Sequence, residues 1–133
     1  LDATGRDAVA HEIQDSYGGH PQEAGMYHYH TISDAVAALD ATDEHGMTLV
    51  GYAFDGFGIY GEAEYGATLR TDDLDECHGH SHEITWDGAE TDMYHYHVTK
   101  DFPYTVGCFK GESSVQGPLA VRLRRQASIW LGR

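Results

Sequence analysis

The 133-residue chain contains several short stretches in which residue types alternate with a period of two. The clearest are Tyr27–His30 and Tyr94–His97, where tyrosine and histidine strictly alternate. Residues two apart on a β-strand point to the same face of the strand. The pattern therefore predicts two strands, each with its histidines on one face and its tyrosines on the other. We expect the tyrosines to pack in the core with their hydroxyl groups hydrogen-bonded.

Other stretches predict further short elements. The apolar run Met47–Phe54 predicts a buried strand, followed by a turn and a second strand at Ile59–Gly61. Ser33–Asp40 predicts a short helix with Ser33 as its N-cap. After His97, the sequence predicts a strand end, a proline-containing loop and a short strand that holds Cys108. Sixteen glycines, many beside histidine or aromatic residues, indicate a loop-rich β fold.

The alternating stretches belong to a longer internal repeat, in which Gln14–His30 aligns with Leu74–His97. The aligned pairs are Asp15 with Asp75, Gly19 with Gly79, His20 with His80, His28 with His95, and His30 with His97, while Tyr17 falls on Cys77. Two copies are too few for a solenoid, which needs about three or more repeats. We therefore expect two quasi-equivalent halves, about 8–61 and 62–112, related by a pseudo-two-fold axis around a shared core.

The predicted fold class is mainly β: a single compact, loop-rich domain of short antiparallel strands with one or two short helices. A chain of this length suits one domain, which we assign to residues 1–112. The remaining segment, 113–133, is predicted to be a basic and poorly ordered tail. Its last sixteen residues contain four arginines and no acidic residue.

The charge of the chain narrows the function classes. The chain has 22 acidic and 8 basic residues, with a net charge of −14. Nucleic-acid binding needs clustered lysine and arginine, so this class is excluded. No run approaches the roughly 18 apolar residues of a membrane span. The acidic surface indicates either a salty habitat or an attraction for cations.

The histidines of the repeat have the spacing of metal ligands. Two imidazoles at i and i+2 on a strand can reach one ion, and a third histidine follows a glycine in each copy. Three histidines with an open fourth position are the ligand set of catalytic zinc, and copper(II) also favours imidazole. We therefore predict metal ligands at His20, His28, His30, His80, His95 and His97, with zinc favoured over copper. Whether the two triads bind two ions or share one is left open.

Three functions are compatible with this site. The first is a metal-binding domain, extended in a second reading to a hydrolase whose metal-bound water attacks an ester, amide or phosphate. Its general base and small-molecule substrate are not identified, and the candidate bases are Asp15, Asp55 and Asp75. Asp15 and Asp75 could instead orient a ligand histidine or cap a turn. With copper in place of zinc, the alternative is a copper-dependent oxidative enzyme or a copper-handling protein. The third function is that of a structural module without metal, whose histidines are only hydrogen-bonded. The sequence does not determine the oligomeric state.

Four blocks of the sequence resemble the YHYH-domain protein family. They are "QDSYGGHP" at Gln14–Pro21, "GYAFDGFGIYG" at Gly51–Gly61, "LDECHGH" at Leu74–His80 and "YHYHVTKDFPYTVGCFKG" at Tyr94–Gly111. The resemblance covers roughly residues 8–111. It departs at Gly58, where the family has proline, and at His78, where the family has asparagine.

The resemblance also bears on the two cysteines, which the sequence alone leaves as either free thiols or a pair. Family members have a cysteine at the position of Tyr17 and another soon after the first YHYH segment, and this chain lacks both. Cys77 and Cys108 remain. The resemblance therefore implies a Cys77–Cys108 disulfide and a secreted or periplasmic location.

Overall fold

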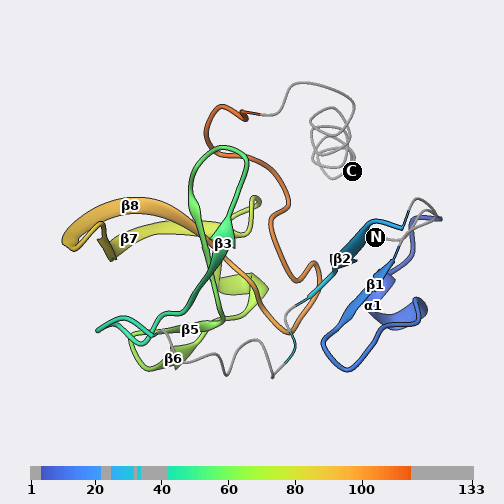
Figure 1. Ribbon diagram of the computed structural model, residues 1–133. Coiled ribbons are helices and arrows are strands. Elements are labelled where there is room, and N and C mark those ends of the chain that lie inside the picture. Colours follow the sequence, from blue (N-terminus) through green and yellow to red (C-terminus); the bar gives the residue numbers. More distant parts are fainter. Residues whose placement is uncertain (1–3, 22–24, 32, 34–41, 115–133) are drawn as a thin grey trace.

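The computed structural model describes residues 4–21, 25–31, 33 and 42–114, and these residues form a mainly β fold (Figure 1). The predicted fold class is confirmed. In chain order, the elements are α1 (Ala8–His11), β1 (Gly19–Pro21), β2 (Tyr27–Tyr29), β3 (Leu49–Tyr52), β4 (Gly58–Tyr60), β5 (Ala63–Glu64), β6 (Ala67–Thr68), a 3-10 turn η1 (Thr71–Asp73), β7 (Gly79–Trp86) and β8 (Ala89–His97). None of the described helices is long and apolar enough to cross a membrane.

The largest unit is a four-stranded sheet with the strand order β3-β4-β8-β7. β7 and β8 form a long antiparallel hairpin around a turn in which Asp87 and Gly88 both have positive φ. β4 lies parallel to β8, with Ile59 opposite Tyr96 and Tyr60 opposite His97. The expectation of antiparallel strands is wrong for this pair. The parallel direction puts the Tyr60 ring beside the β8 histidines, 5.4 Å from the His95 ring.

The two faces of β8 have different environments, as the alternation predicts. His95 and His97 point to the same side as Tyr60, and all three are buried. Tyr94 and Tyr96 are also buried, but they pack on the opposite side with Phe57, Ile59, Val106 and both cysteines. The hairpin therefore separates a histidine face from a tyrosine face.

Several local expectations are wrong or fall outside the described residues. The strand expected over Met47–Phe54 is shorter and forms an edge of the sheet, which leaves the Tyr52 side chain exposed. Cys108 lies in a loop rather than a strand. Tyr27 and Tyr29 are exposed because β1 and β2 form a separate two-stranded sheet with no layer of described residues over its tyrosine side. The predicted helix beyond Ser33, and the predicted tail beyond its first two residues, lie outside the described residues.

Both copies of the repeat form a hairpin with the same register and the same hydrogen bonds. His20 pairs with His28 in one hairpin, and His80 pairs with His95 in the other. Asp15 and Asp75 each accept backbone N–H groups from the residues two and four positions later. Each aspartate also accepts the hydroxyl of the first tyrosine in its own YHYH segment. The repeat therefore encodes one local structure twice, while the two-fold relation between the halves stays a prediction.

The glycine that precedes the first histidine of each copy is required by this arrangement. In the second copy, the Tyr94 ring crosses over Gly79 to reach Asp75. A Cβ added at Gly79 would meet the His95 carbonyl oxygen and would lie 2.6 Å from the Tyr94 hydroxyl. Gly19 has the same relation to the Tyr27 ring.

We therefore expect Gly79→Ala to lower the free energy of unfolding by about 1–3 kcal/mol, because the added methyl group overpacks the hairpin. Urea denaturation of purified protein measures this change. Gly51→Ala is the matched control, since Gly51 also lies in a strand but a Cβ added there would have no other atom within 4 Å. Equal stability of the two variants would contradict the close packing over Gly79.

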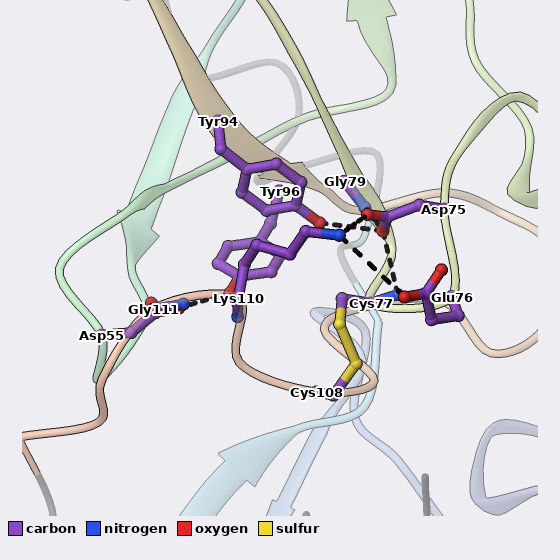
Figure 2. Close-up of a disulfide and its surroundings, with 10 residues drawn as sticks. All are labelled: Asp55, Asp75, Glu76, Cys77, Gly79, Tyr94, Tyr96, Cys108, Lys110 and Gly111. Atoms are coloured by element: carbon purple, nitrogen blue, oxygen red, sulfur yellow. Dashed lines mark hydrogen bonds and ion pairs between the residues drawn. A yellow bond between two sulfur atoms is a disulfide. The ribbon is translucent and has the colours of Figure 1, made fainter.

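The tyrosine face is fastened to the chain segment that follows β8. Cys77 forms a disulfide with Cys108, as the family resemblance implies. Figure 2 shows Lys110 reaching past the Tyr94 ring to Asp75, with an Nζ–Oδ2 distance of 2.9 Å. The Tyr96 hydroxyl accepts the backbone N–H of Lys110 and donates to Asp55. The disulfide and these polar contacts hold the returning segment against the back of the histidine hairpin.

Candidate metal centres

The described residues contain three groups of histidine and carboxylate side chains able to hold a metal ion. They are Glu64, His80, His95 and His97; His20, His28 and His30; and Glu44, His45 and Glu90. The first two groups contain all six histidines that the sequence singles out. Each triad gathers within its own hairpin, and the two hairpins lie apart in Figure 1. The arrangement therefore offers two centres rather than one shared ion.

The group on β7 and β8, which we call the buried centre, consists of Glu64, His80, His95 and His97. His95 and His97 are 0% exposed, and Glu64 is 6% exposed. One Glu64 oxygen lies 3.3 Å from His80 Nε2, 3.3 Å from His95 Nε2 and 3.9 Å from His97 Nε2. Four donor atoms from three elements therefore converge, three of them on buried residues and one on His80, whose side chain is 25% exposed.

The hydrogen bonds of His95 and His97 leave the inward-facing nitrogens of these two rings without protons. His95 Nδ1–H donates to the Met93 carbonyl at 3.1 Å, and His97 Nδ1–H donates to the Gly61 carbonyl at 2.7 Å. A neutral imidazole has only one N–H, so the Nε2 atoms of both rings carry lone pairs. These lone pairs face the Glu64 carboxylate, which is also an acceptor, and His97 Nε2 has no hydrogen-bond partner among the described residues. A cation satisfies all of these acceptors at once.

Burial keeps these rings neutral. It lowers the pKa of His95, and it lowers the pKa of His97 to about 4, even though the Nδ1 hydrogen bond of each ring to a backbone carbonyl acts in the opposite direction. A metal ligand must be deprotonated, so both rings are in the form that binds an ion.

The lowered pKa of His97 makes the stability of the metal-free protein depend on pH. A group with a depressed folded pKa contributes stability above its unfolded pKa, near 6.5, and that stability is lost as the pH falls toward its folded pKa of about 4. We expect the free energy of unfolding to fall between pH 6.5 and 4, by about 1.4 kcal/mol per pH unit for each proton taken up. Urea denaturation at several pH values measures the slope.

His97→Gln should reduce that slope by about 1.4 kcal/mol per pH unit, the contribution of one proton. His11→Gln, at an exposed position of α1, should leave the slope unchanged. Identical slopes for the parent protein and His97→Gln would contradict a buried neutral imidazole at this position.

Glu64 is the ligand candidate that sequence reasoning missed. It ends β5, and the turn to β6 through Tyr65 and Gly66, both at positive φ, folds this short hairpin over the histidine face. The Tyr65 hydroxyl fixes the hairpin by donating to the Glu83 carbonyl at 2.8 Å. The two-residue turn is visible in the sequence. Nothing in the sequence distinguishes Glu64 from the other 21 acidic residues, however, because its burial arises only from tertiary packing.

The group on β1 and β2, which we call the outer centre, consists of His20, His28 and His30. His30 Nε2 lies 2.9 Å from His20 Nε2 and 3.0 Å from His28 Nε2. All three rings are partly exposed. His28 Nδ1–H donates to the Met26 carbonyl, which matches the bond from His95 to Met93 in the buried centre. Burial lowers the pKa of His30, and the neighbouring His28 lowers it further.

The three aspartates considered as general bases lie on the tyrosine side of their hairpins. Asp15 and Asp75 cap turns and bind tyrosine hydroxyls, as described above, and Asp55 accepts from Tyr96 and from the Gly111 N–H. These contacts support the turn-capping alternative for Asp15 and Asp75. No hydrogen bond joins any of the three to a ligand histidine within the described part of the chain. Their catalytic role stays a prediction that the geometry does not favour.

Among the other histidines near the site, His82 Nδ1 lies 3.5 Å from Glu64 Oε1, on a side chain that is 51% exposed. His78 and His45 have other partners. His78 is buried and donates from Nδ1 to the His97 carbonyl, while its Nε2 lies 3.1 Å from the Thr71 hydroxyl. His45 belongs to the third group, where its Nε2 lies 2.8 Å from a Glu90 oxygen. The hydrogen bond to Glu90 raises the pKa of His45, so a surface ion pair accounts for this group without a metal.

Comparison with known proteins identifies one family. The sequence profile described as YHYH protein matches residues 2–70, slightly more than half of the chain, including the first YHYH segment and Glu64. No curated protein and no solved structure shows a significant match. The comparisons therefore name a family and no reaction.

Proposed function

Because the chain belongs to the YHYH protein family, whose name specifies no chemistry, we propose its function from the geometry: it binds a divalent transition-metal ion at the buried centre. The observation that carries this proposal is the enclosed set of acceptors formed by Glu64, His95 and His97. Buried polar groups in folded proteins are almost always satisfied. Without a cation, two imidazole lone pairs and a carboxylate face one another in a region shielded from water.

The donor set supports a divalent ion such as zinc. Three imidazoles and one carboxylate match zinc chemistry, whereas the soft thiolate ligands that select copper(I) are missing from the group. Copper(II) also accepts imidazole, so a copper-handling role is the second candidate, and elemental analysis distinguishes the two ions.

The fourth donor changes the expectation of hydrolysis. A catalytic zinc site has three protein ligands and one open position, whereas a closed set of four is typical of a structural site. Glu64 takes the fourth place in the buried centre. Hydrolysis through a metal-bound water would require Glu64 to leave the ion, or an ion with more than four positions. We therefore propose stable metal binding as the primary function.

We also infer that the protein acts outside the cytosol. The Cys77–Cys108 disulfide supports this location, because structural disulfides persist in oxidising compartments.

Reconstitution tests the proposed function. Protein purified without a histidine tag would be stripped of metal, incubated with zinc or copper(II), freed of excess ion and examined by elemental analysis. We expect at least about one ion per chain, because the donors are already in place. Less than about 0.2 ion per chain after incubation with zinc, and also after incubation with copper(II), would contradict metal binding.

A further inference from the structure

Glu12 lies against the outer centre. It follows α1 directly, and its backbone N–H donates to the Ala8 carbonyl at 2.9 Å. Its Oε2 atom is 2.5 Å from His20 Nε2 and 3.5 Å from His30 Nε2. The same oxygen is shielded from solvent and makes no hydrogen bond with the described residues. A carboxylate oxygen that is shielded from solvent therefore points into a cluster of imidazole nitrogens, within ion-pair distance of two of them.

The close contacts between polar atoms in this cluster outnumber the N–H groups that could join them. His28 Nδ1–H donates to the Met26 carbonyl at 3.3 Å, and an imidazole with its single N–H at Nδ1 has only a lone pair at Nε2. His30 Nε2 faces three atoms at once: His20 Nε2, His28 Nε2 and Glu12 Oε2. A single N–H can serve only one of them. The cluster therefore has four close contacts but at most two N–H groups, one on His20 and one on His30, to join them.

We propose that Glu12 is a metal ligand, and that with His20, His28 and His30 it holds a second divalent transition-metal ion that exchanges faster than the ion of the buried centre. This inference rests on the proposed function, because it extends metal binding to a second site of the same donor chemistry. Glu12 and Glu64 do not occupy corresponding positions of the internal repeat. The carboxylates therefore reach the two hairpins by different routes, one from a helix end and one from a β-turn.

The faster metal exchange expected at the outer centre follows from the greater exposure of its ligands and from the shorter strands that carry them. All four outer ligands are partly exposed, with Glu12 at 24% and His20 at 15%, whereas at the buried centre only His80, at 25%, is partly exposed and His95 and His97 are completely buried. The outer hairpin has strands of three residues each, and the buried centre lies on strands of eight and nine residues within a four-stranded sheet. Short strands with few neighbours open at lower free-energy cost. Differences in affinity between related sites arise mostly in the dissociation rate.

Chelator competition tests the proposal. The protein would be loaded with zinc, freed of excess ion and mixed with a chromophoric chelator, and zinc release would be followed with time. We expect two phases of about one ion each, with the fast phase at least about tenfold faster. Glu12→Gln should abolish the fast phase or accelerate it at least about tenfold, because the amide is a much poorer metal ligand than the carboxylate. The slow phase in the same sample reports that the domain is folded.

Two variants serve as controls. Glu112→Gln makes the same chemical change at an exposed position and should leave both phases unchanged. Glu64→Gln should change only the slow phase. If Glu12→Gln releases zinc as the parent protein does, or if the parent protein binds one ion that Glu64→Gln alone weakens, the inference fails while the proposed function stands. If the parent protein binds no zinc at all, both fail.

Discussion

Replacing Glu64 with glutamine is expected to weaken metal binding and, at the same time, to stabilise the metal-free protein. The carboxylate can only accept hydrogen bonds, and it faces the Nε2 lone pairs of His95 and His97. A glutamine amide of the same shape can donate to one of these nitrogens, which should raise the free energy of unfolding of the metal-free form by about 1 kcal/mol. Loss of the anionic ligand should lower the affinity for zinc by at least about 10- to 100-fold.

The opposite signs of these two effects distinguish a metal centre from a structural ion pair. Urea denaturation of metal-free protein measures the first effect, and competition with a chelator of known affinity measures the second. Glu112→Gln, at an exposed position, is the control for the loss of one negative charge. A metal-free Glu64→Gln protein that is less stable than its parent would indicate that Glu64 pairs with a protonated histidine instead.

Removing the disulfide with the double substitution Cys77→Ser and Cys108→Ser is expected to lower the free energy of unfolding by about 3–4 kcal/mol. The bridge closes a loop with a sequence separation of 31 residues, so its loss frees a long segment in the unfolded chain. Cys77 is also buried against Tyr94 and Tyr96, on the reverse of the strand that carries His95 and His97. Denaturation of the variant, compared with the oxidised parent protein, measures the change.

Lys110 allows the covalent and polar contributions of this region to be separated (Figure 2). Its ammonium group pairs with Asp75 at 2.9 Å but is 44% exposed, and such surface pairs contribute little, about 0–1 kcal/mol. Lys110→Met should therefore cost far less than loss of the disulfide. Equal losses for the two variants would show that the Lys110 ion pair contributes as much stability as the bridge, which would contradict the expected order.

The alternation of tyrosine and histidine predicts the strands β2 and β8, because a period of two translates directly into two faces of a strand. The same pattern predicts burial correctly for Tyr94 and Tyr96 and wrongly for Tyr27 and Tyr29. The difference lies outside the repeated word. β8 runs through the middle of a sheet, whereas β2 pairs only with β1 among the described strands. A local pattern does not contain this information.

The candidate site shows the same division between local and long-range information. The spacing of the six histidines predicts the two triads, since each triad forms within one hairpin. Glu12 and Glu64 reach those triads from other elements, so their roles depend on how α1 and the β5–β6 turn pack. Asp15 and Asp75 are conspicuous in the repeat, but their short distance along the chain directs them to the turn rather than to the histidines.

Anomalous diffraction tests the central claim most directly. Crystals of zinc-loaded protein without a histidine tag would be measured on both sides of the zinc absorption edge. We predict an anomalous peak bonded to Glu64 and to the Nε2 atoms of His80, His95 and His97. Zinc found in the protein by elemental analysis, with no peak at these four residues, would contradict a metal centre at the buried site.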